Sequence, residues 1–226
     1  MKLVIFDLDG TILDTVADLG GAVNRTLEAR GLPVHSLPEY KMMVGRGMRN
    51  LVKAALPQTE RRDDAFVDAF LKDFLSYYLS HIDCATLPYP GIPELMRTLS
   101  REGFALAVAS NKLQEGTEKL IGKFFPEIAF TSVCGNSPRY PLKPDAALVE
   151  HIIGEAGARR EDTVIVGDSE IDIRTAKNAG VPVVAVTWGF RPAEYLRDAD
   201  FIAESAEQLG AVLTGKSIWN SKICKK

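Results

Sequence analysis

The sequence has few cysteines, and those few form no pattern. Cys84, Cys134 and Cys224 are the only three among 226 residues, and they lie far apart along the chain. An odd number at these spacings provides neither the paired ligands of a zinc site nor a disulfide framework. We therefore expect a protein of a reducing compartment and predict a cytoplasmic location.

Long apolar runs and an excess of basic residues are also missing. No stretch approaches the roughly 20 apolar residues that cross a bilayer. The first apolar run, residues 3–6, is short and ends in acid, unlike a cleavable secretory leader. Lys and Arg number 27 against 30 Asp and Glu, so the net charge is −3 and there is no sign of a basic face. We expect neither a membrane nor a nucleic acid as a partner.

What the sequence does contain is a set of short, β-rich apolar runs, and helical patterns separate the later ones. The runs cover residues 3–6, 104–110, 163–167 and 181–188. Short apolar strands that alternate with helices are typical of a parallel sheet buried on both faces. The predicted fold class is therefore α/β, a Rossmann-like parallel sheet core flanked by helices.

Between the first two runs the pattern is helical only. The aromatic residues Phe66, Phe70, Phe74 and Tyr77 or Tyr78 recur there at helical spacing, which indicates the packed side of a helix. Helices are predicted over 16–31, over a short segment ending near Gly45, over 47–57 and over 59–83. We predict a core domain of residues 1–14 and 85–213, an inserted helical cap domain of residues 15–84, hinges at 14–16 and 86–91, and a basic tail of residues 214–226.

Two acids, Asp7 and Asp9, end the first apolar run in the stretch DLDG. Residues two apart in an extended chain point to the same side, so their carboxylates repel unless a cation lies with them. Asp-Gly is also a common turn dipeptide, which would account for Gly10 but not for Asp7. A calcium loop is excluded because Gly10 comes too early and no closing Glu follows at the right place.

Polar residues follow the other predicted strands as well. Ser110 and Asn111 come at the end of the run 104–110, and Asp168 follows the run 163–167. Lys143 precedes a proline that can start a helix. Each feature alone could be a helix cap or a surface lysine. Because parallel strands bring their carboxyl ends to one edge, where ligands bind, we expect all of these groups in one site.

This set of residues suits Mg²⁺-assisted phosphoryl transfer. Mg²⁺ prefers carboxylates, waters and substrate phosphate oxygens. We predict that Asp7, Asp168 and the backbone carbonyl of Asp9 hold the ion, with Asp172 as a supporting ligand. The cation would then screen the repulsion between the acids of the first run.

The same residues predict a covalent mechanism. Asp7 would attack phosphorus and form an aspartyl-phosphate. Asp9 would protonate the leaving oxygen and then deprotonate the hydrolytic water. The phosphoryl oxygens would be held by Ser110, Lys143 and backbone amides near Gly10 and Asn111.

These motifs together resemble the four-motif pattern of the haloacid dehalogenase superfamily of phosphatases. The match rests on DLDGT, the Ser-Asn strand end, KP and GDSEID, and it runs from Met1 to about Leu213. The resemblance implies the nucleophile at Asp7, the acid/base at Asp9, a phosphate-binding hydroxyl at Ser110, the third-motif lysine at Lys143, and the acidic fourth motif at Asp168 and Asp172. It also implies that the helical insert is a cap.

Within the superfamily, the stretches FDLDGTILDT, VGRGMRNLVKAAL, ASNK and VTWGFR look most like those of phosphoglycolate phosphatases. Arg46 lies between Gly45 and Gly47 at a helix start, and we predict that it binds the carboxylate of 2-phosphoglycolate. The alternative is a solvated surface arginine. The tail after Leu213 departs from the resemblance and has no counterpart.

The leading hypothesis is a phosphatase for a small phosphorylated metabolite, with 2-phosphoglycolate favoured, acting as a monomer or homodimer. One alternative is a phosphomutase of the β-phosphoglucomutase type. Another, from a different class, is a receiver module that accepts phosphate on Asp for signalling. Against it, receivers are single small doubly wound domains and lack a large helical insert.

Overall fold

The computed structural model describes residues 1–220, and a six-stranded sheet forms its centre. The strand order is β5-β4-β1-β6-β7-β8, and all neighbouring strands run parallel. The predicted α/β class with a parallel sheet is confirmed. The strands are β1 (Leu3–Phe6), β4 (Ala105–Leu113), β5 (Ser132–Asn136), β6 (Thr163–Gly167), β7 (Val183–Val186) and β8 (Phe201–Ala203).

Helices cover both faces of this sheet, as the apolar strands require. Leu3 and Ile5 pack with α7 and α8, whereas Val4 and Phe6 face the other core, which contains α5, α6 and α9. This alternation follows the two-residue period of a strand. The helices are α5 (Ile92–Arg101), α6 (Gln114–Phe124), α7 (Ala147–Glu155), α8 (Glu170–Ala179) and α9 (Ala206–Thr214), and short 3-10 turns lie at Glu60–Arg62, Arg160–Asp162 and Ala193–Leu196.

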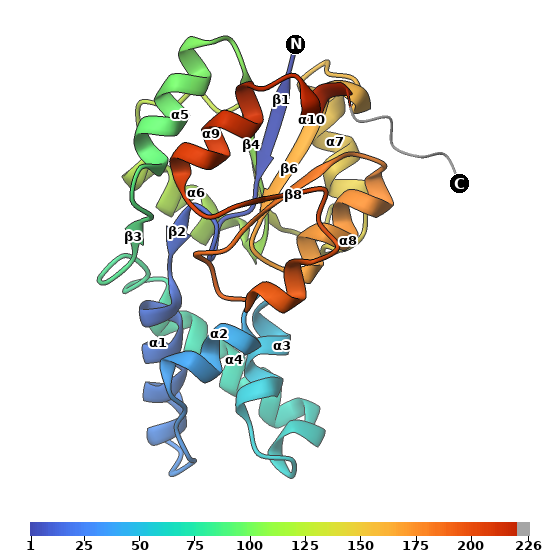
Figure 1. Cartoon of the computed structure of the whole chain (residues 1–226). Helices are drawn as coiled ribbons and strands as arrows, with labels where there is room; N and C mark the ends of the chain where they lie inside the picture. The colour runs from blue at the N-terminus through green and yellow to red at the C-terminus, as the bar shows by residue number, and fades with distance from the viewer. Residues whose placement is uncertain (221–226) are drawn as a thin grey trace.

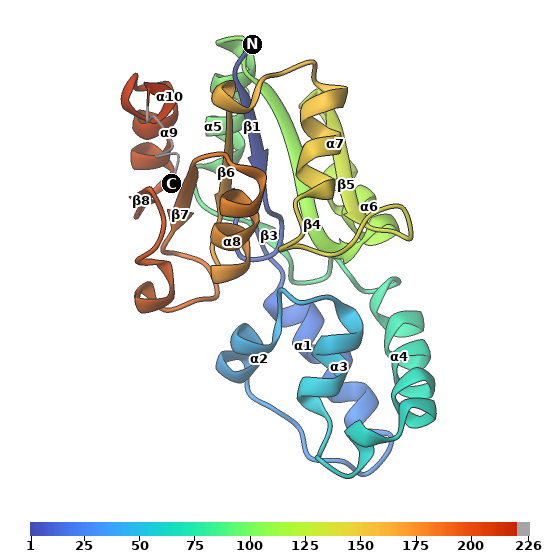
Figure 2. The same cartoon turned by 90° about the vertical axis from the view of Figure 1, so that its right-hand side faces the viewer.

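Four further helices form a separate group at the carboxyl ends of the strands (Figures 1 and 2). They are α1 (Val16–Glu28), α2 (Leu37–Met43), α3 (Met48–Ala55) and α4 (Asp64–Tyr78). Two short strands, β2 (Leu13–Asp14) and β3 (Leu87–Pro88), pair antiparallel where the chain enters and leaves this group. The helical insert is therefore placed where ligands of a parallel sheet bind.

The long helix expected over 59–83 is interrupted. Asp63 leaves the helical conformation, and its side chain accepts hydrogen bonds from the backbone N–H groups of Ala65 and Phe66. This is an N-cap, so α4 begins at Asp64 and ends at Tyr78. The buried side of α4 consists of Val67, Phe70, Phe74 and Tyr78. Of the two tyrosines that the spacing allowed, Tyr78 is therefore the buried one.

Other boundaries also differ from the sequence prediction. The strands β5 and β8 were not predicted; β5 (SVCGN) is mostly half-buried, and both lie at the edges of the sheet, where burial and apolar content are low. Pro144 does not start a helix. The helix α7 begins three residues later at Ala147, whose N–H donates to the side chain of Asp145. None of the helices within residues 1–220 has the length and apolar character to span a bilayer.

The first part of the predicted tail packs onto the core. A short helix, α10 (Ser217–Asn220), buries Ile218, and the indole of Trp219 donates to the carbonyl of Leu213. The Lys2 ammonium lies 4.8 Å from the centre of the Trp219 ring. The rest of the tail, with Cys224, lies outside the described residues. The division into core, cap and tail at the predicted boundaries stays a prediction.

Candidate active site

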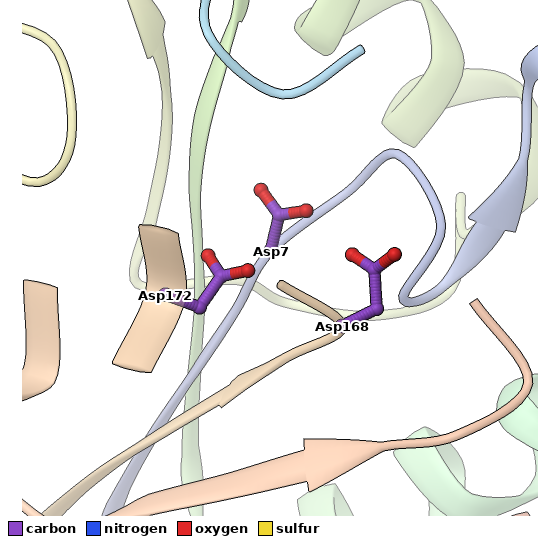
Figure 3. A group of neighbouring side chains, drawn as sticks. All are labelled: Asp7, Asp168 and Asp172. Carbon is purple, nitrogen blue, oxygen red and sulfur yellow. The ribbon is translucent and has the colours of Figure 1, made fainter. Parts of the chain in front are cut away.

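Three buried carboxylates meet at the carboxyl edge of the sheet. One oxygen from each of Asp7, Asp168 and Asp172 lies within 4.8 Å of the others. In Figure 3 the carboxyl groups of Asp168 and Asp172 flank that of Asp7. The predicted meeting of the first and fourth motifs at one edge is therefore found in the structure.

Strand pairing and a helix cap produce this cluster. β1 and β6 are neighbours in register, and the N–H of Asp7 donates to the carbonyl of Val166, so Asp7 and Asp168 follow adjacent strands. Ser169 caps α8, and Asp172, three residues later, accepts from its N–H and hydroxyl. This capping box fixes Asp172 beside the other two acids.

Lys143 ties the cluster together from a distant part of the chain. Its ammonium is 2.7 Å from a carboxylate oxygen of Asp7 and 2.7 Å from one of Asp172. The side chain of Asn111 holds the backbone of Lys143, accepting from its N–H at 2.8 Å and donating to its carbonyl at 3.0 Å. Burial disfavours the charged lysine, but the two carboxylates outweigh it and raise the pKa of Lys143.

Burial first, and neighbouring carboxylates second, disfavour the ionised forms of Asp7 and Asp168 and so raise their pKa values. Burial raises the pKa of Asp7 well above its ordinary range, against the opposing pull of Lys143. Burial, with the neighbouring Asp172, raises the pKa of Asp168 to about 7. Both directions fit a site in which a bound cation would favour the ionised carboxylates.

The charge balance of the site fits a divalent cation. When all four are ionised, the carboxylates of Asp7, Asp9, Asp168 and Asp172 exceed the two buried ammonium groups of Lys112 and Lys143 by two charges. The guanidinium of Arg191, on the same cavity wall, is paired with Glu170. Hard oxygen ligands of this kind are those that Mg²⁺ takes in proteins. Asp172 has both oxygens engaged, one by Lys143 and one by Ser169, which suits a supporting position better than a direct one.

Gly10 has a steric reason to be glycine. It lies at φ 88°, and a Cβ there would come 2.4 Å from a carboxylate oxygen of Asp168. A larger residue would push Asp168 out of the cluster. The turn at Gly10 therefore serves the site, because it leaves room for the carboxylate of Asp168.

The remaining predicted core residues lie on the same cavity wall. Ser110 is buried, and its hydroxyl accepts from the N–H of Lys112 at 3.2 Å. The pairing of β4 with β5 shifts register between Ala109 and Leu113, so this stretch departs from regular strand alternation. The cavity is lined by Asp7, Asp9, Ser110, Asn111, Lys143, Asp168 and Asp172, with Leu19, Met48 and Leu51 from the insert.

Arg46 does not lie on the cavity wall. Its side chain is 61% exposed and pairs with Glu170 at 3.2 Å. The arginine that does line the cavity is Arg191, which is buried and was given no role from the sequence. Its guanidinium donates to the carbonyls of Lys41 and Val44, so it connects the core to the helical insert.

Comparison with known proteins agrees with this geometry. A model of the haloacid dehalogenase-like hydrolase family matches residues 4–186, which is most of the chain. The chain belongs to this family. The superfamily resemblance predicted from the four motifs is confirmed.

Curated relatives that are named for an activity are similar to this hydrolase over most of their length. A phosphoglycolate phosphatase of Agrobacterium fabrum is 36% identical over 83% of this chain and 81% of its own. Another, from Caulobacter vibrioides, is 34% identical over 89% of this chain and 86% of its own. The predicted enzyme class, phosphoric monoester hydrolase, is confirmed.

The solved structures show the same architecture. A crystal structure from Lactobacillus delbrueckii subsp. bulgaricus superposes on the hydrolase with a TM-score of 0.86 and 33% identity. It covers 95% of this chain, and all of its own length is matched. The likeness therefore extends over the helical insert as well as the sheet.

Proposed function

We propose that this hydrolase is a Mg²⁺-dependent phosphatase that cleaves a small phosphate monoester through an aspartyl-phosphate on Asp7. The observation that carries the proposal is the buried cluster of Asp7, Asp168 and Lys143 at the edge of the sheet. A lysine beside a carboxylate offsets its charge, so that a phosphate dianion can approach the nucleophile. Mg²⁺, held by Asp7, Asp168 and the carbonyl of Asp9, would supply further positive charge to the phosphoryl oxygens.

The steps divide between the two acids of the first motif. A carboxylate oxygen of Asp7 forms a bond to phosphorus as the ester oxygen leaves, and Asp9 gives that oxygen a proton. Asp9 then takes a proton from water, whose oxygen attacks phosphorus. The bond to Asp7 breaks, inorganic phosphate leaves, and both carboxylates return to their starting state.

The helical insert would act as the cap that excludes water during these steps. Its support is a set of contacts between the insert and the core. The Asn111 amide donates to the carbonyl of Gly45 at 2.9 Å, and Arg191 donates to that of Val44 at 2.6 Å. Both contacts end at the loop that begins α3, where Gly45 and Gly47 lie on the cavity wall.

We propose 2-phosphoglycolate as the substrate, on the strength of the named relatives. A panel of phosphate esters with Mg²⁺, scored by kcat/KM, tests this assignment. Release of inorganic phosphate, fastest from 2-phosphoglycolate, is the expected result. Isomerised hexose phosphate without phosphate release would favour the phosphomutase, and a stable phospho-Asp7 without turnover would favour the receiver module. Cytoplasmic location and a monomer or homodimer stay predictions.

Replacing Lys143 tests the proposed role of its charge. Lys143→Ala should lower kcat by about 10²–10³, comparable to the loss of one preorganised electrostatic donor. It leaves Asp7 and Asp172 facing each other, so the unfolding midpoint should fall as well. Lys143→Arg should restore little, because a planar fork does not replace a compact ammonium. Lys177→Ala, which alters an exposed pair with Asp198, is the control, and normal activity of both Lys143 variants would remove this role.

Replacing Arg46 tests the carboxylate assignment. Arg46 pairs with Glu170 outside the cavity, so it would have to exchange Glu170 for the substrate carboxylate when the substrate binds. On that hypothesis, Arg46→Ala should raise KM for 2-phosphoglycolate about 10-fold, as expected for loss of a charge-assisted hydrogen bond. It should barely change the kinetics with p-nitrophenyl phosphate, which has no carboxylate. Arg49→Ala is the matched control, because Arg49 pairs with Asp64 and Asp68 inside the insert. Equal losses with both substrates would assign the Arg46–Glu170 pair to cap closure and not to substrate selection.

A further inference from the structure

A second buried lysine lies beside the proposed acid/base. The side chain of Lys112 is 1% exposed, and its ammonium is 2.9 Å from Oδ1 of Asp9. The same ammonium donates at 2.5 Å to the hydroxyl of Tyr78. Asp9 and Lys112 belong to the core, whereas Tyr78 is the last residue of α4 in the helical insert.

Burial of the Lys112 ammonium is unfavourable unless its partners, Asp9 and Tyr78, are held in place. An ammonium removed from water requires good partners, because its desolvation is strongly unfavourable. Lys112 finds one charged partner and one neutral partner, and the two come from different parts of the chain. A buried group that contacts both the acid/base and the insert is placed to connect them.

The contacts also distinguish the two oxygens of Asp9. Thr15 donates to Oδ1 at 2.6 Å, and Lys112 donates to the same atom. An oxygen that already accepts two hydrogen bonds is not the one that carries a proton. A proton carried by Asp9 would therefore lie on Oδ2, and the carboxyl group has one defined orientation.

We propose that Lys112 is a positioning residue that orients Asp9 for proton transfer to the leaving oxygen, and that Tyr78 makes this orientation depend on the insert. The inference rests on the proposed role of Asp9 as acid/base. Movement of α4 away from the core would remove the hydroxyl of Tyr78 from Lys112 and loosen the ammonium. Proton transfer would then be efficient only with the insert in place.

Substrates that differ in their need for an acid test this inference. An alkyl ester such as 2-phosphoglycolate needs protonation of its leaving oxygen, whereas p-nitrophenyl phosphate has a stable leaving anion. The variants are Lys112→Met and Tyr78→Phe, with Lys177→Met and Tyr77→Phe as matched controls. The measurement is the rate of alcohol release in a single turnover with enzyme in excess, which isolates the first step from hydrolysis of the intermediate.

Lys112→Met should slow alcohol release from the alkyl ester about 10²-fold, within the range of general acid catalysis, and from the aryl ester only a few-fold. Tyr78→Phe should change the alkyl-to-aryl ratio in the same direction by about 10-fold at most, and should add nothing in the Lys112→Met background. The controls should leave the ratio unchanged. Equal losses with both esters, or full additivity of the two variants, would overturn the proposal.

Asp9→Asn separates this inference from the proposed function. If Asp9 is the acid, Asp9→Asn lowers the alkyl-to-aryl ratio, and adding Lys112→Met to it lowers the ratio no further. If Asp9→Asn leaves the ratio unchanged, the acid/base assignment itself fails. If the ratio falls in Asp9→Asn and falls again with Lys112→Met, Lys112 acts by another route and the inference fails alone. The double variant also avoids leaving a buried carboxylate unpaired, so it covers the case in which Lys112→Met does not fold.

Discussion

Asp7→Asn should lower kcat by about 10⁴-fold or more, comparable to the loss of a covalent nucleophile in other hydrolases. Asn keeps the shape of the side chain but has no charged oxygen to attack phosphorus. It also removes one of the three carboxylates that approach one another at the sheet edge. The measurement is phosphate release from 2-phosphoglycolate at saturating Mg²⁺. Appreciable turnover of the variant would contradict the aspartyl-phosphate mechanism.

The same variant should remain folded. Burial raises the pKa of Asp7, so its ionised form is disfavoured in the folded state, and a neutral amide relieves that cost. Lys143 keeps Asp172 as its charged partner at 2.7 Å. Circular dichroism and the unfolding midpoint should match those of Asp198→Asn, a control at an exposed ion pair. A large fall in the unfolding midpoint of Asp7→Asn would mean that its loss of activity results from unfolding and not from the missing nucleophile.

Removal of metal should abolish turnover, and Mg²⁺ should restore it. Asp168→Ala should lower kcat by orders of magnitude or raise the Mg²⁺ requirement strongly, because Asp168 lies in the buried cluster with Asp7. Asp172→Ala should have a smaller effect on the Mg²⁺ requirement, since both of its oxygens are already engaged by Lys143 and Ser169. Turnover is measured against Mg²⁺ concentration after EDTA treatment. Full activity of the wild-type protein in metal-free buffer would exclude this site.

Thermal unfolding gives a second test of the metal that does not depend on activity. The pKa of Asp168 is raised to about 7 in the folded protein, from an ordinary value of 3.8. Its contribution to stability is therefore full below 3.8 and is lost as the pH rises through about 7. The metal-free protein should lose stability over this range, and Mg²⁺ should raise the unfolding midpoint more at pH 8 than at pH 5. The dependence on pH should be weaker in Asp168→Asn.

Much of the fold follows from short-range patterns in the sequence. The alternation of Leu3, Val4, Ile5 and Phe6 between the two cores is fixed by strand geometry. The turn that follows α1 contains Gly31, at φ 65°, although the helix itself ends at Glu28 and not at Gly31 as predicted. The acids after β1 and β6 meet because parallel neighbours end at one edge. Each of these features depends on residues close together in the chain or on a rule that parallel sheets share.

Other features depend on contacts between distant segments, and the sequence alone did not predict them. The helical spacing was compatible with burial of either Tyr77 or Tyr78. In the structure α4 buries Tyr78, and the hydroxyl of Tyr78 accepts a hydrogen bond from Lys112 of β4.

The choice between the two arginines was of the same kind. Arg46 was favoured because it lies between two glycines, but Arg191 lines the cavity, since the loop after β7 contacts the insert at the carbonyls of Lys41 and Val44.

Strand periodicity and parallel pairing are local or general rules, so the residues alone predicted the α/β class, four of the six central strands, the order of the motifs and the acids at the sheet edge. Contacts between distant segments bring Lys112, Tyr78 and Arg191 to the site, and the sequence pattern assigned no role to these residues there. Their positions depend on burial and on partners 34 to 150 residues away in the sequence, which a local pattern does not reveal.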